Sequence, residues 1–261
     1  MNIAFFHNVL LFCWLTVFSC ETTGKTMMIP GESPQTMIIQ ADQLGNFFVV
    51  NQDGILQKYG PTGKVSFQYN NHRAGKITSF DATEPMKILV FFKESQELIL
   101  LDNTLSEISI IPLNQLDGRY FSAVARTNDG SLVMYDANNE ILLKTDEKLV
   151  IEAESFPLFQ EGFPGFKPHQ IKCNNQHILL NDPKTGLILM DNFCNFRKII
   201  PIQHATLVAL NDDYMVYLKN DKLIKSDLIF FEEQIIPWPD HQAMPLYFGY
   251  QHDRLILPDV R

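Results

Sequence analysis

Three polar side chains end predicted strands at positions where oxygen ligands could gather. Asp42, Asp81 and Asn211 each finish a short strand that we expect to lie innermost in its sheet. A bound divalent cation requires carboxylate and amide oxygens that converge from several strands. Two other innermost strands carry Arg126 and Lys172 instead, and these would repel a cation. Polar residues at strand ends also cap turns, so the sequence predicts neither a metal nor another cofactor.

The remaining reactive residue types form no recognised catalytic pattern. None of the seven histidines stands at the H-x-x-x-H or H-E-x-x-H spacing of a metal-binding helix. The chain contains no Gly-rich phosphate loop and no G-x-S-x-G nucleophile elbow. Four histidines lie in or beside predicted links, where we expect them to be solvated: His72, His169, His204 and His241. The sequence therefore names no catalytic residue.

Of the four cysteines, Cys13 and Cys20 belong to the N-terminal segment. Cys173 and Cys194 lie in the fourth copy of a strand pattern that recurs along the chain. The later two fall at turns that we expect on one face, about two strand spacings or roughly 10 Å apart. A disulfide requires a closer approach, which flexible loops could provide. A Cys173–Cys194 disulfide and two unpaired thiols both remain open.

Residues 1–19 carry no charged side chain and are largely apolar. Their core, Val9 to Phe18, has the length of a signal-peptide apolar region and is short for a membrane span of about 20 residues. We therefore predict a signal peptide at 1–19, followed by residues 20–35 as a linker that includes a closing strand, and a folded domain over 36–261.

The segment Val17-Phe18-Ser19-Cys20 resembles a bacterial lipoprotein signal, in which the cysteine takes the lipid. The resemblance implies lipidation of Cys20 and a lipoprotein of the outer membrane that faces the periplasm or the cell surface. The segment departs from the pattern because no Lys or Arg precedes it and Phe18 is bulky. Simple cleavage after Ser19 and an uncleaved anchor are the alternatives. All three place residues 21–261 outside the cytoplasm.

The charge balance argues against nucleic acid as a partner. The chain has 21 basic and 30 acidic residues, a net charge of −9, and no cluster of Lys and Arg. Electrostatic binding to nucleic acid or to an anionic membrane surface depends on such clusters. Contact with a membrane is expected only through the lipid anchor.

A pattern of paired apolar strands recurs along the chain. The strand that follows each polar turn begins at intervals of 43, 43, 46 and 36 residues, at Ile55, Leu98, Ile141, Leu187 and Leu223. Another apolar strand precedes each turn, and one further short strand flanks the pair on either side. Four short strands with a period of about 40 residues are typical of β-propeller blades. A β-sandwich would not require this self-similarity.

Five copies are complete, and Met244 to Val260 supplies two strands of a sixth. A ring of blades that does not close exposes a strand edge. We therefore predict an all-β, six-bladed β-propeller whose last blade is closed by the N-terminal strand Lys25 to Pro30.

The blade at Gly45 to Gly63, with Asn46, Val49 and Tyr59, resembles NHL-type or YncE-like propeller blades. The whole chain, Cys20 included, is similar to small β-propeller lipoproteins of the Bacteroidetes cell envelope. This resemblance implies a fold and an address in the cell, and it carries over no catalytic residue.

The links between blades differ most from copy to copy. Residues 156–168 contain four Phe among three Pro and two Gly, and residues 237–245 form a second Pro-rich link with Trp238. We select four candidate anchors for a partner: Phe159, Phe163, Phe166 and Trp238. The alternative is that these rings fold down between blades as local core. An apolar patch on one face would mark a partner site.

The sequence thus favours a non-catalytic binding or scaffold protein of the bacterial cell envelope. It would engage envelope proteins through the face that bears the links between blades. The alternative is a periplasmic hydrolase, lactonase-like, or a lyase, with a site at the central channel.

Overall fold

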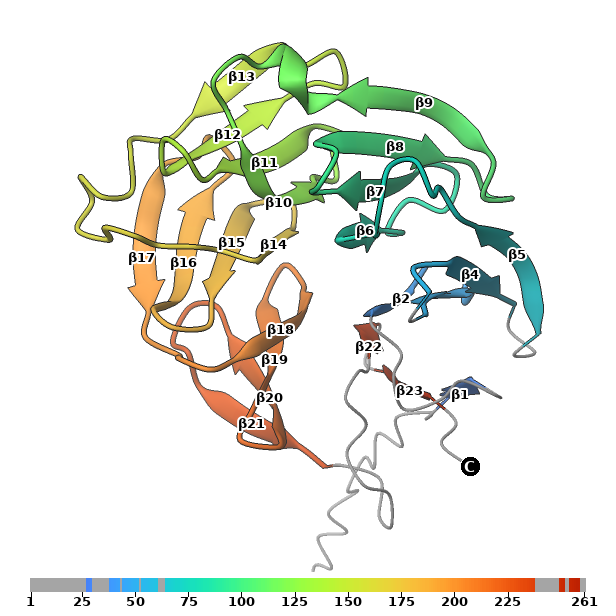
Figure 1. The fold of residues 1–261 in the computed structure, drawn as a ribbon. Coiled ribbons are helices and arrows are strands. Elements are labelled where there is room, and N and C mark those ends of the chain that lie inside the picture. Colours follow the sequence, from blue (N-terminus) through green and yellow to red (C-terminus); the bar gives the residue numbers. More distant parts are fainter. Residues whose placement is uncertain are drawn as a thin grey trace, which may run out of the picture.

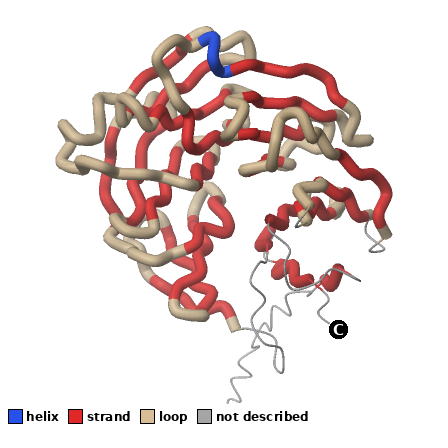
Figure 2. The backbone as a smooth tube through the Cα atoms, in the orientation of Figure 1, coloured by secondary structure: helices blue, strands red, loops and turns tan. Residues whose placement is uncertain are grey.

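The computed structural model describes residues 27–29, 38–42, 44–51, 53–60, 64–237, 249–251 and 254–258. Within these ranges the regular structure is β-strand apart from one short 3-10 helix, η1 (Leu113–Gln115), as Figure 2 shows. The signal segment 1–19, Cys20 and Trp238 lie outside the described residues. Within them, no helix is long and apolar enough to cross a membrane.

Five four-stranded antiparallel sheets follow one another along the described chain, and we number them blades 1 to 5. Their strands are β2 (Ile38–Ala41), β3 (Phe47–Val50), β4 (Leu56–Tyr59) and β5 (Val65–Tyr69) in blade 1; β6 (Ser79–Asp81), β7 (Ile88–Phe92), β8 (Glu97–Leu101) and β9 (Glu107–Pro112) in blade 2; β10 (Phe121–Arg126), β11 (Leu132–Asp136), β12 (Ile141–Thr145) and β13 (Ile151–Glu154) in blade 3; β14 (Gln170–Cys173), β15 (His177–Asp182), β16 (Gly186–Asp191) and β17 (Phe196–Ile200) in blade 4; and β18 (Thr206–Leu210), β19 (Tyr214–Lys219), β20 (Lys222–Asp227) and β21 (Glu233–Ile236) in blade 5.

The blades stand around a central axis, with their first strands innermost (Figure 1). Strand β10 lies between β6 and β14, and β14 in turn contacts β18. Within each blade the chain runs outward strand by strand in antiparallel pairs, so the repeat in the sequence corresponds to the blade in space. This arrangement confirms the predicted propeller architecture.

The expectation of six blades is wrong. The described chain forms five blades, and the remaining strands β1 (Met27–Ile29), β23 (Arg254–Pro258) and β22 (Gly249–Gln251) form a three-stranded sheet between β18 and β2. In that sheet β1 pairs with β23 in parallel, whereas neighbouring strands of every blade are antiparallel. A hairpin that receives its third strand from the other end of the chain does not reproduce the four-stranded meander.

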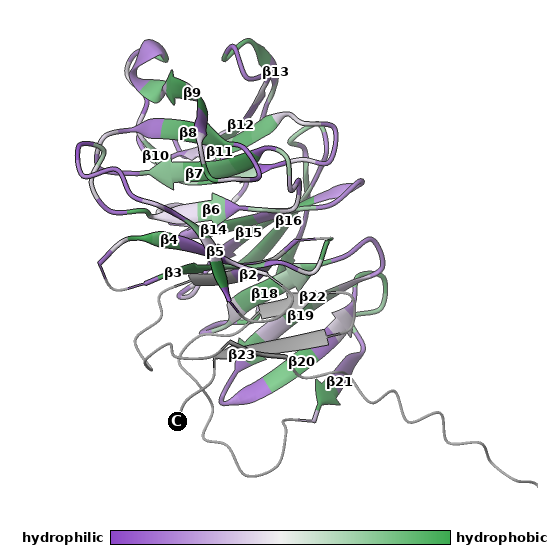
Figure 3. Ribbon diagram, turned by 90° about the vertical axis from the view of Figure 1, so that its right-hand side faces the viewer, coloured by the Kyte–Doolittle hydropathy of each residue, from purple (hydrophilic) through white to green (hydrophobic). Residues whose placement is uncertain are grey.

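The core lies between neighbouring blades. All five residues of β7, of β11 and of β12 are buried, which is possible only because both faces of these sheets are covered. Figure 3 shows the same distribution, with hydrophobic colour on the middle strands and hydrophilic colour on many of the connecting turns. Phe48 of blade 1, for example, packs against Phe80 of blade 2 with ring centroids 6.4 Å apart. Continuous apolar runs in the sequence therefore correspond to strands sandwiched between two other blades.

Aspartate side chains build the turns between the third and fourth strands. In blades 2 to 5 the last residue of the third strand, or the residue after it, is an Asp whose carboxylate accepts backbone N–H groups of the turn: Asp102, Asp146, Asp191 and Asp227. A residue near the end of each turn has a positive φ of about 60°: Leu105, Leu149, Cys194 and Phe231. The carboxylates satisfy N–H groups that the tight turn leaves without strand partners.

We predict that these turns make the fold acid-sensitive, most clearly at Asp191. Partial burial favours the protonated carboxyl, but donors from Asn195, Phe193 and Arg197 outweigh it and hold the pKa of Asp191 below its ordinary value. Because the folded pKa is depressed, the stabilisation is complete above the unfolded pKa of about 3.9 and is lost as the pH falls through the folded value.

Urea unfolding between pH 7 and pH 3 tests this expectation. The free energy of unfolding of the wild type should fall more steeply below about pH 4 than that of the Asp191→Asn variant, which retains an acceptor oxygen but cannot ionise. Parallel curves for the two proteins would contradict the assignment.

Candidate functional site

The link at residues 155–169, between blades 3 and 4, is the longest described connection between blades, and buried contacts fix it. The backbone N–H of Leu158 donates to the Glu140 carbonyl at 2.8 Å, and the Tyr135 hydroxyl donates to the Phe166 carbonyl at 2.9 Å. The side chains of Leu158 and Phe166 are buried in the apolar cluster between the two blades. Phe163 packs on Phe196 with ring centroids 5.3 Å apart. The link is thus a folded part of the core.

Two other rings of the same link point outward. The side chain of Phe156 is 72% exposed and that of Phe159 is 50% exposed. The sequence-selected anchors therefore divide: Phe159 is on the surface, Phe163 is partly buried and Phe166 is core. Phe156, which the sequence analysis did not select, is more exposed than any of the three.

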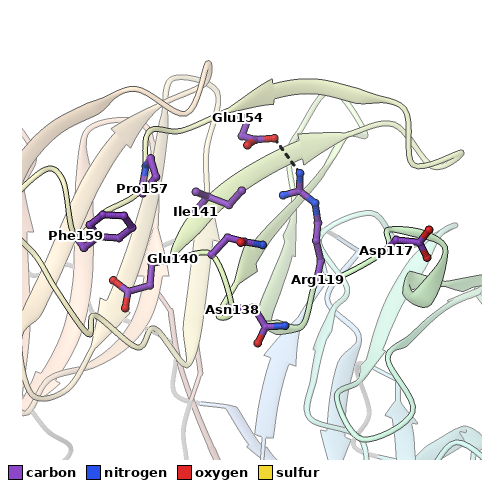
Figure 4. Close-up of a pocket in the computed structure, with 9 residues that line it drawn as sticks. Asp117, Arg119, Asn138, Glu140, Ile141, Glu154, Pro157 and Phe159 are labelled. Carbon is purple, nitrogen blue, oxygen red and sulfur yellow. Dashed lines mark hydrogen bonds and ion pairs between the residues drawn. The ribbon is translucent and has the colours of Figure 1, made fainter.

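Phe159 lines an open pocket of about 560 Å³ at the outer part of blade 3 (Figure 4). We call this cavity the pocket; it is lined by Asp117, Arg119, Asn138, Asn139, Glu140, Ile141, Glu154, Pro157 and Phe159. The lining comes from the link before blade 3, the β11–β12 turn, strands β12 and β13 and the link after blade 3. In an antiparallel blade these turns and links emerge on one side, which we call the link face.

A buried carboxylate, Asp136, holds the pocket wall together. It accepts the backbone N–H of Asn138 at 2.9 Å and the side-chain amide of Asn139 at 2.6 Å. It also accepts the N–H of Tyr120 at 3.2 Å, and its Oδ2 lies 3.7 Å from Nη1 of Arg119. The β11–β12 turn and the preceding link are therefore fixed to the same side chain, and the pocket is preformed.

The charges that line the pocket do not balance. Asp117, Glu140 and Glu154 contribute three carboxylates, and Arg119 contributes the one cation of the lining. Arg119 is already committed, since its Nη2 lies 3.2 Å from Glu154 and its Nη1 faces buried Asp136. Within the described part of the chain, neither Asp117 nor Glu140 forms an ion pair. The pocket therefore offers negative charge beside an exposed aromatic ring.

The polar residues of the innermost strands bond neighbouring groups of the same chain. The Asp42 carboxylate accepts the N–H groups of Leu44 and Asn46, and Asp81 accepts the N–H of Thr83. The guanidinium of Arg126 pairs with Glu84 at 3.1 Å and with Glu147 at 3.1 Å.

The carboxylates of Asp42 and Asp81 thus cap turns. For Asn211 the structure gives a backbone role, because its N–H donates to the Tyr214 carbonyl at 2.8 Å. The part of the chain that the structure describes contains no group of three or more His, Cys, Asp or Glu side chains arranged to hold a metal ion.

Cys173 and Cys194 are free thiols that contact the apolar cluster between blades 3 and 4. Burial raises the pKa of Cys194 to about 12 and raises that of Cys173 as well. Both thiols are therefore protonated at neutral pH, which lowers their reactivity as nucleophiles. Their contacts are those of small apolar side chains.

Sequence reasoning missed most of the pocket lining. The pattern Asn138-Asn139 was recognisable as a turn, and Phe156 stood in the selected link, but nothing local connects Asp117 or Arg119 with Glu154. These residues meet because β13 and the two links lie side by side at the edge of one blade. The signal that could have found Phe156 is its position at the start of the link, two residues after the end of β13.

The blades and the closed ring of inner strands place the chain in the class of β-propellers. Many solved structures are similar to it, among them the following three. Streptogramin B lyase aligns with a TM-score of 0.59 and 12% identity over 85% of this chain and 75% of the lyase. A protein of unknown function from Bacteroides caccae gives a TM-score of 0.51 and 14% identity over 84% of this chain and 78% of its own.

The third, a candidate exported protein from Bacteroides fragilis, gives a TM-score of 0.53 and 11% identity over 82% of this chain and 74% of its own. At these identities the likeness concerns the fold alone. No protein-family model matches the sequence, and no curated protein matches it.

We predict stability effects of very different size for two rings of the same link. Phe166→Ala removes a ring that is 1% exposed and contacts Tyr135, so unfolding should require about 3–5 kcal/mol less free energy. Phe159→Ala removes a half-exposed ring and should change the free energy of unfolding by no more than about 0.5 kcal/mol. Urea denaturation of the two variants measures both values. Equal losses would show that Phe159 belongs to the core.

Proposed function

We propose that this protein is a non-catalytic binding module of the bacterial cell envelope that engages a protein partner through the link face. The observation that carries the proposal is the pair of exposed rings, Phe156 and Phe159, held on a link that the buried side chains of Leu158 and Phe166 fix to the core. Interfaces are enriched in aromatic residues, and anchors that are ordered before binding lose little conformational entropy.

An envelope location has two supports. The N-terminal segment has the composition of an export signal that ends at Cys20. The similar structures include a candidate exported protein of Bacteroides fragilis. Lipidation of Cys20 and a place in the outer membrane belong to the proposal, as does the absence of nucleic acid among the partners.

The enzymatic alternative, lactonase-like or lyase-like, would place a reaction at the innermost strands. There the Asp42 and Asp81 carboxylates accept turn N–H groups, and the guanidinium of Arg126 pairs with two glutamates. The similarity of this chain to a solved lyase structure is a similarity of the fold alone. We therefore favour binding at the link face.

Site-specific photocrosslinking in cells tests the interface. With a photoreactive phenylalanine analogue at position 159, we expect a discrete adduct with an envelope protein. The same analogue at Ile108, which is 51% exposed on β9 of blade 2, serves as the control and should give none. A Phe156→Ser change should weaken the adduct at position 159 several-fold, because the adjacent anchor is lost. No adduct at 159, or an identical adduct at 108, would contradict the proposed surface.

The membrane anchor is tested separately by labelling cells with a radioactive fatty acid. We expect the label on the protein, complete loss of label in Cys20→Ala, and release of that variant from the membrane fraction. Cys13→Ala should retain the label, since it changes a cysteine within the signal segment. Unchanged labelling of Cys20→Ala would exclude that residue as the lipid attachment site.

A further inference from the structure

The two blades beside the pocket contain equivalent turn residues that differ in charge. Gln96 in blade 2 and Glu140 in blade 3 each precede the third strand of their blade, and both have a φ of 54°. The carbonyl of each accepts an N–H from the link that follows the blade. Leu113 donates to Gln96 and Leu158 donates to Glu140, both at 2.8 Å.

Their side chains also bond the chain that follows the blade, at the first residue of β10 for Gln96 and within the next link for Glu140. The Gln96 amide accepts the Phe121 N–H at 2.8 Å and donates to the Phe121 carbonyl at 2.9 Å. Both carboxylate oxygens of Glu140 lie 3.2 Å from the N–H of Gly165. The structural task of this position, to hold the chain that follows the blade, is thus performed in blade 2 by a neutral side chain. The negative charge of Glu140 is not required for it.

That additional charge lies in a pocket whose one cation, Arg119, already faces two other carboxylates. Glu140 and Asp117 have no ionic partner in the described chain, and Arg119 is held by Glu154 and Asp136. Glu140 and Asp117 line the pocket on opposite sides of Arg119 (Figure 4), and unpaired carboxylates that line one pocket attract a cation more strongly than scattered surface charges do. The pocket therefore has an electrostatic preference.

The apolar part of the lining restricts the form of the cation. Phe159, Pro157 and Ile141 line the same space as Glu140 (Figure 4). A long side chain that carries an apolar stem and a cationic head fits such a surface, because its stem packs on the ring while its head reaches the Glu140 carboxylate. A small hydrated ion would leave the apolar wall unused.

We infer that the pocket takes an arginine or lysine side chain of the partner, with Glu140 as the acceptor and Phe159, which lies beside Glu140 in Figure 4, against the aliphatic stem. The inference deepens the proposed function and depends on it only for the statement that the side chain belongs to a protein. Preference of the pocket for a cation is a property of this chain alone.

A titration with small probes tests the preference without knowledge of the partner. The purified protein, labelled with ¹⁵N, is titrated with N-acetyl-arginine amide and, in parallel, with the neutral isostere N-acetyl-citrulline amide. We expect the arginine probe to shift the amide signals of Gly165 and Glu140, and the citrulline probe to bind at least several-fold more weakly.

The variants follow from the comparison of the two blades. Glu140→Gln places at this position the residue that blade 2 uses, so it should fold normally while the dissociation constant of the arginine probe rises about threefold. Glu161→Gln, which removes an exposed charge of the same link outside the pocket lining, is the matched control and should leave it unchanged.

Equal binding of the two probes, or unchanged binding to Glu140→Gln, would overturn the inference. The two proposals fail separately. Loss of the photocrosslink with retained arginine binding would refute the protein partner and leave the pocket's preference intact. A robust crosslink that is indifferent to Glu140→Gln would retain the partner and refute the role of the pocket.

Discussion

Every other feature of this structure depends on the burial of both faces of the middle strands between neighbouring blades. Strands such as β7 and β11 have no exposed residue, so each blade derives its core from the blades on either side. At about 25 cal/mol per Å² of apolar surface, such layers are the main source of stability. A blade alone would expose two apolar faces, and the blades therefore stabilise one another as a ring.

Because the middle strands pack on two neighbouring blades, the blades can differ from one another mainly at their edges, in the turns and links. A substitution within β11 or β12 would disturb two interfaces, whereas a change in a link affects one face. The link at residues 155–169 illustrates the division: Leu158 and Phe166 extend the core, and Phe156 and Phe159 are left over from it. Surplus aromatic surface on a fixed backbone distinguishes a binding surface from a merely long loop.

The pair Gln96 and Glu140 shows how a repeat can separate structure from function. Both residues adopt a left-handed backbone and hold the chain that follows the blade, so their shared properties belong to the fold. They differ by one negative charge, and the structural role does not require that charge. Around Glu140 the other carboxylates and Phe159 make this charge part of a pocket. Repeats within one chain thus provide an internal reference for which property of a side chain the scaffold needs.

The sequence by itself determined the strands, the spacing of the blades and the turn chemistry, because each is a local property: apolar runs of five residues, Asp and Asn at tight turns, and a period of about 40. It did not determine the blade count: the expected pairing of the N-terminal strand with the C-terminal hairpin is present, but β1, β23 and β22 form a three-stranded sheet and not a sixth four-stranded blade, and no local pattern specifies the parallel orientation of β1 and β23. Nor could it separate Phe159 from Phe166, because packing against Tyr135 decides which ring is buried. Only the tertiary structure brings Asp117, Arg119 and Glu154 together, because the pocket is built from three separate segments whose residues have no characteristic spacing in the sequence.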